Sequence, residues 1–124
     1  MAQHKPSMHL TVQTPYLANL RSGLKSHEGR LARPQYLTLH PGDYIQICSV
    51  TIKALEEDAS IFEVRRITRY ETFREMLLAH GVRAFLPEIE DVDEAVQVYR
   101  GFPGYAEGEV ELGVVGIELR LAKE

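Results

Sequence analysis

Two β-prone segments follow one another in the middle of the chain, and they constrain the fold more than any other feature. Residues 44–52 and 61–68 are rich in β-branched and aromatic side chains, and the acidic stretch of residues 55–60 separates them. This pattern predicts two strands joined by a hairpin loop. Because hairpin-linked strands are antiparallel, it favours a mixed or closed sheet over a sheet of parallel strands alone.

A first helix is predicted near the N-terminus, before these strands. Thr14 is a good N-cap, Pro15 is a good first helical residue and Gly23 is a good stop. These three signals predict a helix over residues 15–22. The chain after Gly23 is therefore expected to turn and enter a strand.

The second half of the chain carries two more helix signals. Thr72 and Glu75 have the spacing of a capping box, so a helix is predicted from there to Gly81, and Asp91 caps another helix. Further strands are predicted at residues 8–12, 25–30 and 113–121. The elements together predict one α+β domain over residues 1–124, with about five or six strands and about three helices.

Charge is unevenly distributed along the chain. The formal net charge is −4, but residues 1–70 carry nine Lys and Arg against six Asp and Glu, whereas residues 71–124 carry five against twelve. The overall charge argues against a protein that coats nucleic acid by bulk electrostatics, which needs many phosphate contacts. A local basic surface is still expected, with its centre at Arg21, Lys25, Arg30 and Arg33 and with neighbours at Arg65, Arg66 and Arg69.

The sequence contains no pattern typical of a metal or cofactor site. Cys48 is the single cysteine, and the five histidines show no helical i, i+4 pair, so neither a metal ion nor a cofactor is expected. No segment approaches the roughly 20 apolar residues of a membrane span, and the N-terminus lacks the apolar run of a signal peptide. The cysteine usage fits a cytoplasmic protein.

Three charged residues crowd together just after the first predicted helix. In a regular strand, Glu28 and Arg30 would share one face, and Lys25 would point to the other. Lys25 follows the stop at Gly23 by only two residues, however, so its backbone can still lie in the turn and its long stem can reach the Glu28 side. These residues are therefore expected to line a polar cleft, with Tyr16 at its mouth.

Binding is the chemistry that these residue types favour. Arg30 would offer a bidentate fork to a phosphate, Glu28 could accept from a base, Lys25 would add a point charge, and Tyr16 could stack on a base. The alternative is an ordinary ion pair between Glu28 and Arg30 on a wet surface. Hydrolysis would require Glu28 as a general base with a raised pKa, yet two nearby cations should lower that pKa.

Tyr99 and Phe102 flank or occupy a Gly- and Pro-rich stretch at residues 101–104. This stretch has the composition of a lid, but the two aromatic side chains are interpreted as core residues. Tyr16 is left open between a cleft residue and a core residue.

Gly23, Lys25, Glu28 and Arg30 form a Gly-x-Lys-x-x-Glu-x-Arg pattern. On this pattern the chain resembles the ASCH domain family, the activating signal cointegrator homology family. Four further blocks also look familial, and they follow in the expected order: His40 to Asp43, Tyr70 to Leu77, Glu94 to Tyr99, and Gly113 to Glu118.

The resemblance implies a fold like the PUA RNA-binding barrel, here a mixed β-barrel, and a cleft that binds RNA or a nucleotide. Some small relatives are hydrolases, and one is an acetylcytidine amidohydrolase that depends on a Lys, a Thr and a Glu. Its lysine corresponds to Lys25, but its threonine corresponds to Glu28. The alternatives are therefore a hydrolase of a modified nucleoside or of RNA, with Lys25 and Glu28 as catalytic groups, and a protein-interaction module using the acidic residues 88–111.

Overall fold

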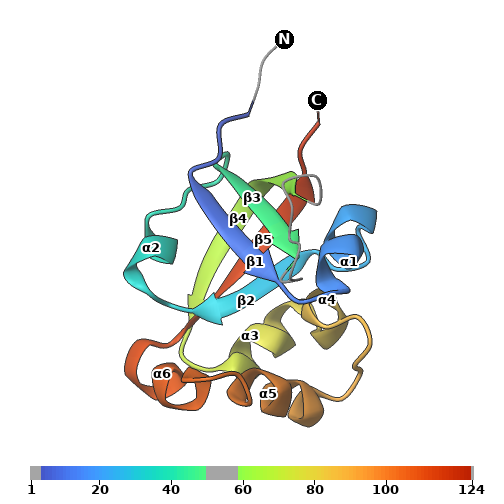
Figure 1. The fold of residues 1–124 in the computed structure, drawn as a ribbon. Helices are drawn as coiled ribbons and strands as arrows, with labels where there is room; N and C mark the ends of the chain where they lie inside the picture. The colour runs from blue at the N-terminus through green and yellow to red at the C-terminus, as the bar shows by residue number, and fades with distance from the viewer. Residues whose placement is uncertain (1–3, 50–58, 124) are drawn as a thin grey trace.

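A computed structural model describes residues 4–49 and 59–123, which form a five-stranded sheet with six helices (Figure 1). The strands are β1 (Met8–Val12), β2 (His27–Leu31), β3 (Tyr44–Ser49), β4 (Ser60–Tyr70) and β5 (Val114–Leu121). The helices are α1 (Tyr16–Ser22), α2 (Pro34–Leu37), α3 (Phe73–His80), α4 (Val82–Phe85), α5 (Val92–Arg100) and α6 (Tyr105–Leu112).

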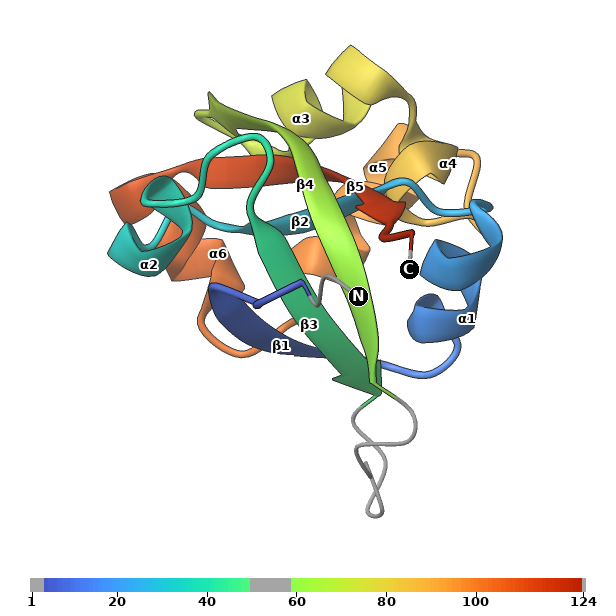
Figure 2. The ribbon, with the colours of Figure 1, turned by 90° about the horizontal axis from the view of Figure 1, so that it is seen from above.

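The sheet is mixed, as the sequence predicted, and it curls into a half-barrel. Its strand order is β1-β3-β4-β5-β2, with β1 parallel to β3 and every other pair antiparallel. In Figure 2 the run of β3 and β4 crosses that of β5 and β2 steeply. The curl brings the two edge strands together. Arg30 of β2 donates from Nη2 to the carbonyl oxygen of Thr11 in β1 at 2.8 Å.

Most strand predictions are confirmed. β1 spans the predicted residues, and β5 begins one residue later than expected. β4 runs two residues beyond its prediction, with a register shift between Val64 and Arg66. β2 begins at His27 and not at Lys25. The part of the prediction for β3 that extends past Ser49, and most of the acidic loop, fall outside the described residues.

Two of the predicted N-caps are confirmed, and one is wrong. Thr72 and Asp91 each accept a hydrogen bond from the backbone N–H three residues later, at 3.1 and 2.9 Å. Thr14 does not cap α1, because Pro15 occupies the N-cap position and Tyr16 N donates to the carbonyl of Gln13 at 2.7 Å. Gly23 ends α1 in the left-handed conformation at φ 85°, which a residue with a Cβ rarely adopts.

Three of the six helices in the described part of the chain were not predicted. α2 and α4 are single turns of four residues, too short to show a helical period. α6 contains Gly108, which reads as a helix breaker in the sequence. A Cβ at Gly108 would lie 2.4 Å from Leu31 Cδ1, so the contact between α6 and β2 requires a glycine there.

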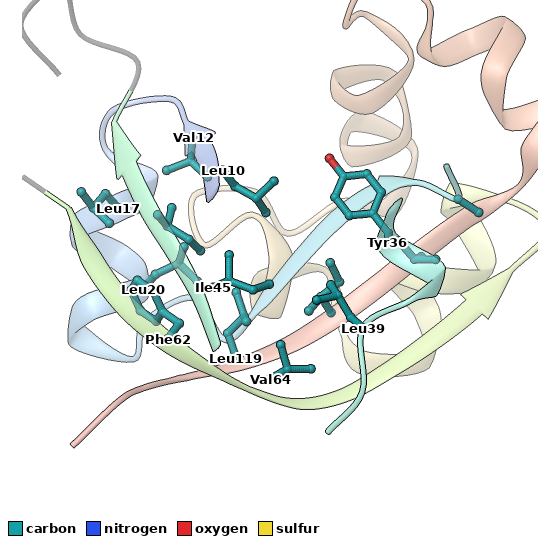
Figure 3. Packing of buried hydrophobic residues seen from close by; sticks show 14 residues of the cluster. Leu10, Val12, Leu17, Leu20, Tyr36, Leu39, Ile45, Phe62, Val64 and Leu119 are labelled. Atoms are coloured by element: carbon teal, nitrogen blue, oxygen red, sulfur yellow. The ribbon is translucent and has the colours of Figure 1, made fainter. Parts of the chain in front are cut away.

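The concave face of the sheet is filled by apolar side chains from the strands, α1 and α2 (Figure 3). This inner cluster contains Leu10, Val12, Leu17, Leu20, Ala32, Tyr36, Leu39, Ile45, Ile47, Phe62, Val64, Val115, Ile117 and Leu119. Helices α3 to α6 gather on the other side of the sheet (Figure 1). They bury a second cluster of Leu31, Phe73, Met76, Leu77, Phe85, Leu86, Ile89, Ala95, Val96, Tyr99 and Val114.

Two glycines let the helical layer approach the sheet closely. Gly29 of β2 and Gly116 of β5 are direct partners in the antiparallel register. A Cβ on Gly29 would lie 2.7 Å from both Met76 Cε and the Tyr99 hydroxyl, and one on Gly116 would lie 3.3 Å from Met76 Cγ and from Phe85. The missing side chains therefore make room for α3 and α5 against the sheet.

None of the helices in residues 4–49 and 59–123 combines the length and the apolar character that crossing a bilayer would require.

Candidate functional site

A cavity of about 220 Å³ lies where the edges of β1 and β2 come together. Its wall consists of the end of β1, the start of α1, the charged part of β2 and the segment that joins α5 to α6. The side chains that matter for its chemistry are Tyr16, Lys25, Glu28, Arg30, Tyr99 and Tyr105. The structure thus brings together four residues that the sequence assigned to a cleft and two tyrosines that it did not assign to it.

Lys25 lies in the turn before β2, and its ammonium group is surrounded by protein oxygens. Nζ lies 2.6 Å from the carbonyl oxygen of His27, 2.6 Å from that of Phe85 and 3.2 Å from Glu28 Oε1. It also lies 5.3 Å from the centroid of the Tyr16 ring. Three acceptors match the three N–H donors of an ammonium ion, so every donor of Lys25 is used within the protein.

Glu28 and Arg30 share one face of β2, as strand alternation predicts. Glu28 Oε2 accepts from Arg30 Nε at 2.8 Å and lies 2.8 Å from Arg30 Nη2, while its Oε1 faces Lys25. Arg30 Nε and Nη2, the fork that was expected to bind a phosphate, therefore contact Glu28. Nη1 is the one guanidinium nitrogen without a hydrogen bond to any residue in the described parts of the chain.

The electrostatics of the trio favour the ionised forms of Glu28 and Arg30, and the three acceptor oxygens around Nζ suit the ammonium form of Lys25. Burial alone would raise the pKa of Glu28, but Lys25 and Arg30 hold it below its usual value. Burial lowers the pKa of Lys25, and Glu28 opposes that shift. Burial likewise acts to lower the pKa of Arg30, and Glu28 outweighs it, so this pKa lies above its usual value. The cavity therefore holds two positive charges and one negative charge.

Three tyrosines complete the wall. The Tyr16 hydroxyl donates to Glu88 Oε1 at 2.9 Å, which holds the ring in place at the cavity wall. The hydroxyls of Tyr99 and Tyr105 make no hydrogen bond to the described residues, and burial raises the pKa of both phenols. In residues 4–49 and 59–123, His27 Nε2 is the one fully buried polar side-chain atom that has no hydrogen-bond partner. The two tyrosine hydroxyls have no partner among these residues either, so they are not fully buried. Both phenols are neutral and can donate.

Two predicted site residues do not line the cavity. Arg33 is exposed at the N-cap of α2. Arg66 is exposed on β4, in register with Glu118, which in turn pairs with His27. Residues in one register row project from the same face of a sheet, so Arg66 belongs to the face opposite Glu28.

The sequence interpretation assigned Tyr99 to the core, and the structure gives it two environments. Its ring stacks on Phe73 with centroids 4.7 Å apart, while its hydroxyl lies over Gly29 at the cavity wall. Phe102 also lines the cavity. A tyrosine on the buried face of an amphipathic helix is a usable signal for such a site, because its hydroxyl needs a polar neighbour or water.

Across the described ranges 4–49 and 59–123, no group of three or more His, Cys, Asp or Glu side chains is placed to hold a metal ion. Cys48 is a free, partly buried cysteine on β3.

Comparison with known proteins identifies relatives of the whole described fold. The ASCH domain model matches residues 10–121. The crystal structure of the hypothetical protein PH0355 is similar, with 31% identity, a TM-score of 0.80, and coverage of 93% of this chain and 98% of that chain. The solution structure of protein PF0455 from Pyrococcus furiosus has 31% identity, a TM-score of 0.73, and coverage of 94% and 98%.

A mutant of ZmASCH from Zymomonas mobilis shares the fold at 17% identity, with a TM-score of 0.61 and coverage of 90% of this chain and 66% of that chain. No curated protein matches the chain. The half-barrel with its helical layer is a PUA-like fold, in agreement with the expectation from the sequence. With a family model matching nearly the full length and two relatives of the same size, the chain belongs to the ASCH domain family.

Proposed function

We propose that this protein binds RNA or a nucleotide in the cavity between β1 and β2. The observation that carries the proposal is the meeting of Lys25, Glu28 and Arg30 with aromatic side chains in one cavity. Ion pairs on an ordinary wet surface do not enclose such a space. Charged donors beside aromatic faces are the combination that single-stranded nucleic acids and nucleotides require.

The size of the cavity supports a small ligand or a single nucleotide unit. Sites for drug-sized ligands measure about 300–1,000 Å³, and this cavity measures about 220 Å³. A continuous strand does not fit into such a space. One nucleotide unit at the end of a chain, or splayed out from it, is the largest piece of RNA that we expect the cavity to accept.

Within this proposal, Lys25 acts as a positioning residue. Its ammonium joins β2 to the end of α4 through the carbonyl of Phe85, and it holds Glu28 in place. Glu28 in turn orients the guanidinium of Arg30. Arg30 and the tyrosines then contact the ligand.

The hydrolase alternative receives less support from the same contacts. A general base needs a raised pKa, and that of Glu28 is lowered. A nucleophilic amine needs a free lone pair, and Lys25 Nζ faces three acceptor oxygens at 2.6 to 3.2 Å. Incubation with acetylated cytidine and with short RNA should therefore give no product.

The binding proposal is tested by titrating the protein into fluorescently labelled single-stranded RNA and following anisotropy. Arg30→Lys keeps the charge but loses the planar fork, and we expect affinity to fall about tenfold, or ~1.4 kcal/mol. Arg66→Ala is the matched control, because it removes an exposed arginine from the opposite face of the sheet.

Equal affinities of the wild-type protein, the Arg30 variant and the Arg66 variant would contradict binding at this cavity. Circular dichroism must first show that the Arg30 variant is folded. Tyr105→Leu provides an independent second test at the cavity wall. It leaves the ion pairs of the cavity in place and should also weaken binding.

A further inference from the structure

Among the polar groups of the cavity wall, more hydrogen-bond donors than acceptors are left without a partner in the described residues. The donors of Lys25 are satisfied by protein oxygens, and Arg30 Nε and Nη2 are held by Glu28 and Thr11. Glu28 already accepts three contacts, out of about four lone-pair directions on a carboxylate. A ligand that is to be bound here must therefore supply acceptor atoms.

The unused donors belong to Arg30 and to two tyrosines. Arg30 Nη1 carries two N–H groups with no hydrogen bond to the described residues, and the hydroxyls of Tyr99 and Tyr105 are in the same state. The Arg30 side chain is 18% exposed, and it meets the cavity at its wall. Arg30 and the two tyrosines thus line one cavity and carry donors that no described residue uses.

The charges inside the cavity do not cancel. Lys25 and Glu28 neutralise each other, and the positive charge of Arg30 remains. Glu88, the next carboxylate, is exposed and is hydrogen-bonded to Tyr16. Glu28 is thus shared between two buried cations, and an anionic ligand group would supply the second negative charge.

Gly29 is the residue that lets the Tyr99 hydroxyl reach this space. A Cβ at position 29 would lie 2.7 Å from the hydroxyl oxygen and 2.9 Å from the adjacent ring carbon. Glu28 and Arg30 lie on either side of this glycine in β2. Residues 28–30 therefore hold the ion pair and also leave room for the Tyr99 ring from α5.

We infer that Arg30 Nη1 and the hydroxyls of Tyr99 and Tyr105 form a subsite for a phosphate group, and that the preferred ligand carries a terminal phosphate on a nucleotide. The inference rests on the proposed function and specifies which part of the ligand enters the cavity. A terminal phosphate fits because it presents several oxygens and does not require a continuous strand to pass through a cavity of about 220 Å³. A phosphate oxygen accepts from a guanidinium more strongly than a neutral carbonyl does.

The test compares uridine with 5′-UMP by isothermal titration calorimetry, and a four-nucleotide uridine RNA with and without a 5′-phosphate. We expect the phosphorylated member of each pair to bind at least tenfold more tightly. Inorganic phosphate should compete with 5′-UMP. Affinity should rise as the pH passes through about 6, because the second ionisation of the phosphate occurs there.

Tyr99→Phe is the diagnostic variant, since it keeps the ring that stacks on Phe73 and removes only the hydroxyl. It should reduce the affinity for 5′-UMP about three- to tenfold and reduce that for uridine by a smaller factor. Tyr44→Phe is the control, because Tyr44 lies on β3 outside the cavity wall.

The outcomes separate the two proposals. Equal affinity for uridine and 5′-UMP, with oligonucleotide binding retained, would overturn the phosphate subsite and leave the proposed function standing. A failure of every nucleoside, nucleotide and oligonucleotide to bind would overturn both. An equal loss of uridine and 5′-UMP affinity in Tyr99→Phe would also overturn the subsite, since the hydroxyl would then not act on the phosphate.

Discussion

The two faces of β2 differ in whether their buried polar side chains have charged partners. On the cavity face, Glu28 and Arg30 are joined by a charge-assisted contact of 2.8 Å, and Glu28 also pairs with Lys25. On the helical face, His27 is 7% exposed and its Nε2 has no partner among the described residues. Its ring instead packs on that of His80, with centroids 4.4 Å apart.

The contrast shows what a buried titratable group needs in order to keep its charge. Glu28 has two cations within hydrogen-bond distance, which outweigh its burial. His27 has no anion in contact, and its pKa falls to about 4. One strand of five residues therefore carries charged side chains on one face and a neutral histidine on the other.

Removing the carboxylate of Glu28 should have the largest effect on stability. Glu28→Leu leaves Lys25 and Arg30 as buried cations without a counter-ion, which typically costs about 3–5 kcal/mol. Urea unfolding measures the change. A double variant that adds Lys25→Met removes one of the two unpaired positive charges. It should recover part of the lost free energy of unfolding. A double variant less stable than Glu28→Leu alone would contradict the account of the cavity face.

Adding a methyl group at Gly29 tests the packing between β2 and the helices α3 and α5. Gly29→Ala places Cβ 2.7 Å from Met76 Cε and from the Tyr99 hydroxyl, and overpacking of this kind costs about 1–3 kcal/mol. Gly116→Ala is the matched comparison, because its nearest contacts are at 3.3 Å. Thermal unfolding should rank the Gly29 variant as the less stable of the two, and the reverse order would be inconsistent with this packing.

The neutral state of His27 predicts a dependence of stability on pH. Burial is the main cause of its low pKa, His80, Lys25 and Arg66 lower it further, and Glu118 opposes them. The unfolded chain binds a proton at His27 near pH 6.5, whereas the folded chain does so near pH 4. Stability is therefore full above pH 6.5 and declines as the pH falls towards 4.

His27→Phe removes this titration and should flatten the profile between pH 6.5 and 5, as urea unfolding at several pH values would show. The contribution of Glu28 is lost only at lower pH, because the pKa of Glu28 in the folded protein lies below its ordinary value of 4.5. A variant with the same slope as the wild type would show that another group titrates.

The smallest effects are expected at the exposed arginines outside the cavity. Arg33→Ala and Arg66→Ala remove side chains that take no part in the ion pairs of the described residues. Surface substitutions of this kind change stability by about 0.5 kcal/mol or less. A clear loss of RNA affinity in either variant would extend the binding surface beyond the cavity.

Local signals explain why parts of the fold could be predicted. Thr72 and Asp91 are caps that act within one turn, and the capping contacts appear as expected. The side of Lys25 also followed from its distance to Gly23. These features depend on neighbours in sequence, so a single sequence contains enough information to predict them.

The parts that were missed depend on distant contacts. Gly108 sits inside α6 because Leu31 of β2 packs against it, and no local pattern reveals that contact. Tyr99 reaches the cavity only because the glycine across from its ring lacks a Cβ. The ion pair of Arg30 with Glu28 was the alternative taken from the sequence, and the structure buries it, whereas the contact of Arg30 with a phosphate stays a prediction.

The location of the binding site can be tested most directly by titrating the ¹⁵N-labelled protein with a short 5′-phosphorylated RNA and recording ¹H–¹⁵N correlation spectra. The account predicts that the largest chemical-shift changes occur at the backbone amides of Gly29, Arg30 and Tyr105, with little change at the amides of His27 and Arg66. Changes centred on the helical face, or on the acidic residues 88–111 without the cavity, would contradict the claim that the space between β1 and β2 is the ligand site.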